Sequence, residues 1–232
     1  MDPAFTNLLT ATASFVGGHF LLSSLPVRMA LVERIGANAH RILYSIVAAA
    51  TIYWMVSAYN DAPYFELWAY STGLRHLQLA LMFPACLLLA AAVTSRSPTA
   101  VGGEKMLSDP KPPAGVLTVT RHPMLWAFLI WAIAHLLGNG DVASVIFFGG
   151  FAVLSAGGMA HIDFRRQATT GSDWGPIALG TSAIPFLAAL QGRTKVDWAG
   201  IGVARLALGV ALYAALLVLH PYLAGVALVD VF

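Results

Sequence analysis

Residues 71–93 of the chain read STGLRHLQLALMFPACLLLAAAV, and this stretch decides the fold class. It contains one charged side chain, Arg75, and nothing charged follows within the stretch. The hydrocarbon core of a bilayer is about 30 Å thick and takes about 20 apolar residues of helix to cross. Because lipid cannot hydrogen-bond the backbone, the stretch is predicted to be a transmembrane α-helix.

Five further apolar runs have a comparable length. The predicted spans are Leu8–Leu25, Ile42–Tyr59, Ser71–Val93, Pro123–Leu137, Val142–Ile162 and Ala199–Leu223. The composition agrees, with 58% hydrophobic and 10% charged residues and a mean hydropathy of +0.74; ordinary soluble domains have about 25% charged residues. We therefore predict an all-α, polytopic membrane helix bundle of six transmembrane helices that forms a single domain over residues 1–232.

Eleven of the thirteen Lys and Arg residues lie in the loops after the first, third and fifth spans. They are Arg28, Arg34, Arg41, Arg96, Lys105, Lys111, Arg121, Arg165, Arg166, Arg193 and Lys195. Cationic loops remain on the cytoplasmic side of a membrane. Both termini are therefore predicted to be periplasmic, in a multi-pass protein of the bacterial cytoplasmic (inner) membrane. The two exceptions to the pattern are Arg75 and Arg205.

The segment between the fifth and sixth spans contains one more apolar run. Ile177–Leu190 is only 14 residues long and includes Pro185. This length predicts a re-entrant or interfacial segment and not a span.

The fifth span carries glycines at helical spacing. One face of this helix carries Gly149, Val153 and Gly157. The face beside it carries Gly150, Leu154 and Gly158. Small residues at this spacing let another helix approach closely; the alternative is that they make room for a flat cofactor. The short turn at residues 138–141 predicts that the fourth and fifth helices are antiparallel neighbours.

Seven histidines are the chemical signal of the chain. Polar groups at membrane depth are functional candidates because they are costly unless paired. Three of them, His19, His76 and His135, are expected to lie within spans. The others are expected where water can reach them: His40, His122 and His161 near the cytoplasmic ends and His220 at the outer interface. The simpler interpretation of each deep histidine is an interhelical hydrogen bond.

Several imidazoles in a helical bundle are also typical of b-type haem. Two neutral imidazoles from facing helices then ligate the iron, and each is oriented by a hydrogen bond to its other ring nitrogen. The haem propionates need cations. Arg75 is the better candidate, since Arg205 can instead extend to the nearby cytoplasmic surface.

Other chemistries have no comparable signal in the sequence. No nucleophile elbow, phosphate-binding loop, C-x-x-C or H-E-x-x-H motif is present. The spans contain no paired carboxylates, and no basic stripe indicates a nucleic-acid partner. The single cysteine, Cys86, cannot form an intrachain disulfide and is expected in the apolar core.

Three groups of residues resemble the NnrU family of membrane proteins. The first is Phe15–His19 (FVGGH) with the later Arg41–Ser45 (RILYS), and the second is Thr120–Trp126 (TRHPMLW) with Ala134-His135. The third is Thr181–Phe186 (TSAIPF), followed by Gly192-Arg193. Together they cover nearly the whole chain.

The resemblance implies a function and a cofactor. Bacterial members of the family support nitrite and nitric oxide reduction in denitrification. A relative in plants and cyanobacteria is a zeta-carotene cis–trans isomerase that binds haem b, whose ligands would correspond to His19 and His135 here. The resemblance gives His122 a structural or cofactor-stabilising role.

The residue pattern adds a geometric condition to this ligand pair. His19 lies past the middle of an inward-running helix, whereas His135 lies near the outer end of the fourth helix, so their depths could differ by about 10 Å. Two axial ligands of one iron must be about 4 Å apart. His76, near the outer end of the third helix, is the reserve partner for His135.

Four functions remain open from the sequence. The first is a membrane haem protein that supports denitrification, with a redox partner, and the second is a haem-dependent isomerase of a lipophilic polyene. The third is an isoprenylcysteine-type methyltransferase, because Arg121-His122-Pro123 also occurs at a helix start in that type of enzyme. Its acidic pair is missing after the fifth span, where the sequence is DFRRQ. The fourth is a structural subunit that holds no cofactor.

Overall fold

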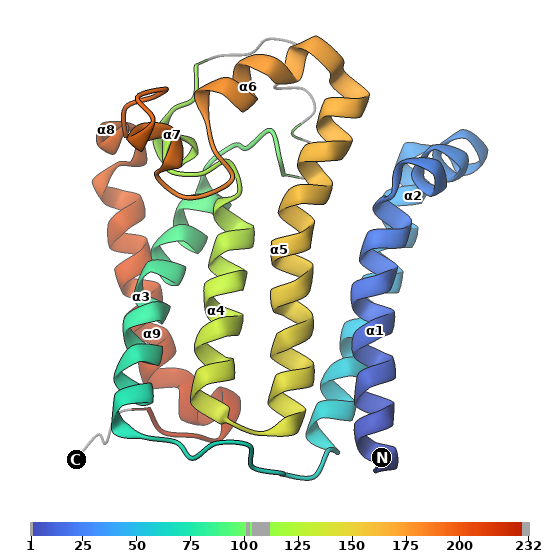
Figure 1. Ribbon diagram of the computed structural model, residues 1–232, viewed down its shortest axis with the longest axis vertical. Coiled ribbons are helices and arrows are strands. Elements are labelled where there is room, and N and C mark those ends of the chain that lie inside the picture. Colours follow the sequence, from blue (N-terminus) through green and yellow to red (C-terminus); the bar gives the residue numbers. More distant parts are fainter. Residues whose placement is uncertain (1, 101–102, 104–111, 229–232) are drawn as a thin grey trace. The chain divides into compact units, whose positions relative to one another are not determined.

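The computed structural model describes residues 2–100, 103 and 112–228, and within them all regular structure is helical (Figure 1). The only β-type pairing among these residues is an isolated bridge between Glu66 and Asp141. Lys105 and Lys111, two of the cationic residues used to predict the orientation, lie outside the described residues.

Each predicted span coincides with a long helix. The long helices are α1 (Pro3–Ser23), α2 (Leu25–Asn60), α3 (Thr72–Thr94), α4 (Pro123–Asn139), α5 (Val142–Thr170) and α9 (Val203–Ala224). Among the residues that the structure describes, four segments are long and apolar enough to cross a bilayer: α2, α3, α9 and the segment Val142–Gly180 that begins with α5. This is the pattern of a multi-pass membrane protein. The membrane crossing of α1 and of α4, which has 17 residues, and the orientation of the termini stay predictions.

The chain separates into two compact units, which are described here one at a time. The first unit consists of Met1–Gln78 and Ala132–Arg165, and the second of Leu79–Trp131 and Arg166–Phe232. Helices α3, α4 and α5 contribute residues to both units. The single domain predicted from the sequence stays a prediction.

The first unit is built on a hairpin of α1 and α2, which pack side by side (Figure 1). Helix α1 begins where the Asp2 carboxylate accepts a hydrogen bond from the Ala4 N–H at 2.8 Å, with Pro3 in the first turn. It ends at Ser24, whose extended backbone starts the turn into α2. Helix α2 is interrupted at Gly36, where φ is +83°. An L side chain rarely adopts this conformation, so a glycine permits the break.

Helix α5 approaches α1 through two of its glycines. A Cβ on Gly150 would collide with the Thr12 Cγ2, and a Cβ on Gly157 would lie 2.9 Å from the Phe20 ring. A Cβ on Gly149 would meet no atom within 4 Å. The predicted close packing is therefore confirmed on the Gly150 and Gly157 positions, and Gly149 is not used for it.

The α4–α5 turn is held by the loop that follows α2. The Gly140 carbonyl accepts the Leu67 N–H at 2.7 Å, and the Val142 N–H donates to the Phe65 carbonyl at 3.0 Å. Gly140 has φ +68°, and a Cβ there would collide with the Trp68 carbonyl. The tight turn predicted from the sequence is confirmed, and α5 begins directly after the turn that ends α4.

The second unit contains the short elements of the chain. They are η2 (Gly115–Thr118), η3 (Gly171–Trp174), α6 (Gly175–Gly180), α7 (Leu187–Leu190) and α8 (Trp198–Ile201). The apolar run 177–190 forms the end of α6, an irregular segment and α7, and its re-entrant or interfacial placement stays a prediction. Helix α9 packs tightly on α3, since a Cβ on Gly209 would lie 2.8 Å from the Leu87 backbone. Cys86 is buried, as expected.

Candidate functional site

His19 lies on α1 in the first unit and is half-buried. Its Nδ1 lies 2.7 Å from the Phe15 carbonyl oxygen, and its ring packs edge-on against Phe15 and Tyr44, with centroids 4.4 and 5.3 Å away. A carbonyl only accepts hydrogen bonds, so Nδ1 carries the proton and the lone pair is on Nε2. Metal-ligating histidines commonly have this arrangement, in which a backbone carbonyl orients the ring.

His135 lies on the part of α4 that belongs to the same unit. It is half-buried, and its ring stacks on Phe148 of α5 with centroids 5.0 Å apart and an interplanar angle of 26°. Ala132 and Ala134 beside it are fully buried. His135 is therefore part of the packed α4–α5 face and not a side chain of the surface.

A continuous row of phenylalanine rings lies between the two histidines. Phe15, which contacts His19, is followed by Phe151, Phe147 and Phe148, which contacts His135. Successive centroids in this phenylalanine row are 5.1 to 5.4 Å apart. Such contacts are normal for tightly packed aromatic cores. The row connects the two histidines through successive ring contacts within one unit. Because its rings lie between the two imidazoles, the histidines do not contact each other.

The helix contacts give the offset between the two histidines. Phe20 faces Gly157 of α5, which places His19 about level with residue 156, whereas His135 stacks on Phe148. Eight residues of helix correspond to about 12 Å, while two nitrogens on one iron are about 4 Å apart. The arrangement therefore fits His19 as a single metal ligand, but it does not bring His19 and His135 to one iron.

His76, the reserve ligand, and Arg75, the better propionate candidate, lie at the start of α3. His76 is exposed at the start of α3. Gln78, two residues later and hence on another face of the helix, is the α3 side chain that packs against Gly138 of α4. Arg75 is half-buried in the first turn of the same helix. The structure does not bring His76 to His135 through this face.

Arg205 in the second unit is bound by backbone carbonyls. Its guanidinium donates to the Thr94 carbonyl at 3.2 Å and to the Gly200 and Ile201 carbonyls at 3.1 Å each. These carbonyls lie at the end of α3 and in α8, where the helix ends leave acceptors unsatisfied. Arg205 thus connects three helix ends. These contacts give Arg205 a structural role; the extension to the cytoplasmic surface and the propionate role both stay predictions.

Two histidines that were expected to be satisfied by water are instead bound by the protein. His40 is 6% exposed, and its Nε2 lies 3.1 Å from the Leu22 carbonyl. The His161 Nε2 lies 3.0 Å from the Ser23 hydroxyl, and Arg165 donates to the Ser23 carbonyl at 3.4 Å. The last carbonyls of a helix have no intrahelical donors, so α2 and α5 supply donors to the end of α1. The sequence predicted His40 and His161 near the cytoplasmic ends of their spans, which is also the predicted side of the end of the first span.

His122 was also expected near water, but it is 2% exposed in the second unit. It therefore belongs to a different unit from His19 and His135. Its backbone N–H donates to the Thr120 hydroxyl at 3.2 Å, and its carbonyl accepts the Trp126 N–H at 3.0 Å. The structure thus places the buried His122 directly before α4, an environment that suits a structural role.

The segments 119–126 and 181–186, which carried the sequence resemblance, hold each other. The Ala183 carbonyl accepts the Thr120 hydroxyl at 2.8 Å and the Trp126 indole N–H at 2.7 Å. The Arg121 N–H donates to the Ser182 carbonyl at 3.0 Å, and the Phe186 N–H donates to the Val119 carbonyl at 2.8 Å. We call this arrangement the motif clamp. It fixes the start of α4 to the segment between α6 and α7.

Two charged residues extend the motif clamp in the second unit. Arg193 donates to the Thr181 carbonyl at 2.8 Å and also to the Ala178 and Leu179 carbonyls at the end of α6. The Asp197 carboxylate accepts the Gly115 N–H at 2.9 Å and the Gly200 N–H at 2.8 Å. These two donors favour the ionised carboxylate and hold the pKa of Asp197 below its ordinary value of 3.8. No pattern in the sequence pointed to Asp197.

The described residues contain no group of three or more His, Cys, Asp or Glu side chains that could hold a metal ion. Among the residues predicted from the sequence, His19 has the hydrogen bond and the ring contacts that a ligand histidine needs.

Comparison with known proteins gives distant relatives of one kind. The chain is 25% identical over 195 residues to the chloroplastic 15-cis-zeta-carotene isomerase of Zea mays, which covers 82% of this chain and 52% of that protein. It is 32% identical over 79 residues to the protein of the same name in Arabidopsis thaliana, which covers 34% of this chain and 22% of the relative. The chain thus spans at most about half the length of these relatives. No solved structure matches it.

The match to a protein family is more extensive than either relative. Residues 7–228, from α1 to the segment after α9, match the family described as NnrU protein. This range includes His19, His135 and both halves of the motif clamp. The chain belongs to the NnrU family.

Proposed function

We propose that the protein is a membrane haem protein and a cis–trans isomerase of a conjugated, lipid-soluble polyene. The observation that carries the proposal is the match over 82% of the chain to a 15-cis-zeta-carotene isomerase, together with the ring orientation of His19. Because the match covers only 52% of this relative, its substrate is taken only as a chemical class: an apolar polyene.

His19 is the residue that would hold haem b. Its Nδ1 hydrogen bond to the Phe15 carbonyl leaves Nε2 as the ligand atom, and Tyr44 and Phe15 restrict the ring. Bound haem would supply a redox-active iron at the edge of an apolar aromatic row. The chain's own residues would orient the imidazole, exclude water and offer a nonpolar surface to a polyene. His135 is the second ligand predicted from the sequence, and it would have to move by about two helical turns relative to His19.

The proposal is tested by purifying the full chain in detergent from haem-replete cells and recording oxidised and reduced visible spectra. We expect a Soret band in the wild type that is lost in His19→Ala and kept in the control His220→Ala, whose ring lies outside the first unit. A wild type without a Soret band, or a band that His19→Ala leaves unchanged, contradicts haem binding through His19. The spectrum of His135→Ala then reports whether His135 is a second ligand.

The catalytic part of the proposal has its own measurement. The haem-loaded protein is incubated in liposomes with a 15-cis polyene, and the isomers are separated by chromatography. We expect conversion to the trans isomer by the wild type and none by His19→Ala. Haem binding without conversion contradicts the isomerase role and favours the other role predicted from the sequence, the support of nitrite and nitric oxide reduction. That role rests on the family alone and is tested by deleting the gene and measuring nitrite consumption.

A further inference from the structure

The break in α2 separates two chemically different helical segments. Before Gly36, residues 25–35 carry Arg28, Glu33 and Arg34 together with exposed apolar side chains such as Met29. After Gly36, residues 37–60 form the part of α2 that packs along α1 (Figure 1). A short helix with cationic and apolar side chains is typical of a membrane interface. The level of the break is therefore where lipid headgroups are expected.

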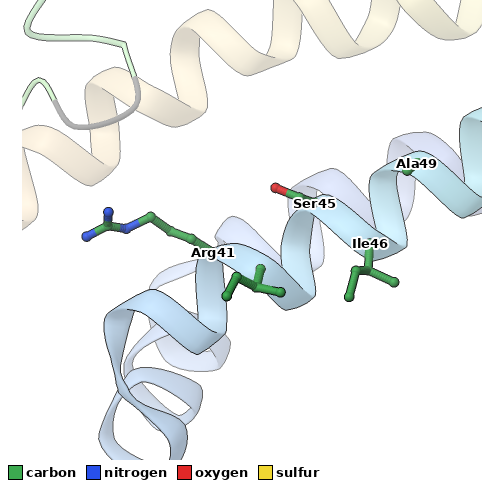
Figure 2. Close-up of a pocket in the computed structure, with 5 residues that line it drawn as sticks. Arg41, Ser45, Ile46 and Ala49 are labelled. Atoms are coloured by element: carbon green, nitrogen blue, oxygen red, sulfur yellow. The ribbon is translucent and has the colours of Figure 1, made fainter.

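A shallow groove of about 350 Å³ lies on α2 directly after this break (Figure 2). It is lined by Arg41, Ile42, Ser45, Ile46 and Ala49. Ile42 and Ile46 are 62% and 60% exposed, so no other part of the first unit covers them. The groove thus has a polar end, formed by Arg41 and Ser45. An apolar row continues from this end along the helix for two turns.

Arg41 has no hydrogen bond or ion pair to any residue that the structure describes. Its guanidinium extends away from the helix at one end of the groove, and the Ser45 hydroxyl lies one turn along on the same side (Figure 2). A guanidinium next to a hydroxyl is well suited to bind phosphate oxygens, since arginine can donate two parallel hydrogen bonds to them. An uncharged polyene would leave the charge of Arg41 without a partner.

We infer that this groove is a binding site for one anionic phospholipid. The phosphate would lie on Arg41 and Ser45, and the first part of one acyl chain would lie along Ile42, Ile46 and Ala49. The volume is at the lower end of the range for ligand sites, so it accommodates the headgroup phosphate and part of one chain. The rest of the lipid stays in the bilayer. This inference is independent of haem and of the proposed isomerase reaction.

The site is tested by native mass spectrometry of the full chain in detergent, titrated with phosphatidylglycerol and, separately, with phosphatidylcholine. We expect the wild type to bind one phosphatidylglycerol in preference to phosphatidylcholine. Arg41→Ala should weaken phosphatidylglycerol binding about tenfold, since a charge-assisted hydrogen bond is lost. Arg34→Ala is the matched control, because it removes the same charge outside the groove and should leave binding unchanged.

A second variant separates the effect of the apolar row on lipid binding from the effect of the Arg41 charge. Ile46→Trp fills the apolar row and keeps every charge, so it should weaken binding of the phospholipid but not of inorganic phosphate. Equal weakening by Arg34→Ala and Arg41→Ala, equal binding of the two lipids, or displacement of the lipid by a neutral polyene would each overturn the inference. Thermal unfolding of each variant in detergent verifies that the exposed substitutions leave the fold intact.

Discussion

At the scale of single residues, one Cβ atom decides how closely two helices approach. Gly149 and Gly150 are neighbours on α5, but a Cβ on Gly150 would collide with Thr12 of α1, whereas one on Gly149 would meet nothing within 4 Å. The sequence shows two adjacent glycines and cannot distinguish them. Their difference arises from the side of α5 that α1 covers.

The first prediction uses this pair. Gly150→Ala should destabilise the protein by about 1–3 kcal/mol, because the added methyl group overpacks the contact with Thr12. Gly149→Ala should be neutral or stabilising by up to about 1 kcal/mol, since alanine favours the helix. Thermal unfolding in detergent measures both. Equal destabilisation by the two changes would mean that α1 does not contact α5 at Gly150.

A second residue-scale prediction concerns Asp197. The Gly115 and Gly200 amides lower the pKa of its carboxylate, so its contribution to stability is present at neutral pH and is lost as the pH falls through its folded pKa. Asp197→Asn should therefore lower the melting temperature at neutral pH, and its difference from the wild type should shrink in acid. A difference that stays constant from neutral pH to pH of about 3 would contradict the role of the charge.

At the scale of elements, the motif clamp shows how two distant sequence motifs form one structural feature. Thr120 and Trp126 lie at the start of α4, and both donate to the carbonyl of Ala183, some sixty residues later. Because Thr120 and Trp126 belong to a motif of the family resemblance, a catalytic role is one interpretation of them. The hydrogen bonds give them a sufficient structural reason, which is the attachment of α4 to the segment between α6 and α7.

The third prediction is a double-mutant cycle on that carbonyl. Trp126→Phe and Thr120→Val should each cost about 1 kcal/mol, because the Ala183 carbonyl keeps one donor in either variant. The double variant should cost more than the sum, since the carbonyl then loses both donors. Chemical unfolding in detergent measures the three values. Trp54→Phe, which removes an exposed hydrogen bond to Asn7, is the control and should have a smaller effect.

At the scale of the whole molecule, the charge distribution predicts a topology that helix lengths alone do not fix. Within the described residues, four segments have the length and hydropathy of spans. The crossing of α1 and α4 is predicted from the alternation of loops with and without Lys and Arg. Six spans would put both termini on one side of the membrane, which the cationic loops predict to be the periplasmic side. The orientation therefore rests on loop chemistry.

The fourth prediction tests this topology with cysteine labelling. In a Cys86→Ser background, Tyr64→Cys should react with a membrane-impermeant maleimide in intact cells. Lys195→Cys should react only after permeabilisation, because its loop is predicted to be cytoplasmic. Both side chains are exposed, so burial does not limit the reaction. The opposite labelling pattern would reverse the predicted orientation.

The helical class, the positions of the long helices and the tight turn after α4 follow from the sequence, because apolar length, glycine and charge act locally along the chain. The environments of the histidines do not. Whether His40 and His122 reach water, or how far His19 lies from His135, depends on which helix faces which and at what register. Those are contacts between residues far apart in the chain, and side-chain packing across the helices, such as Phe15 on Phe151, decides them only in the folded protein.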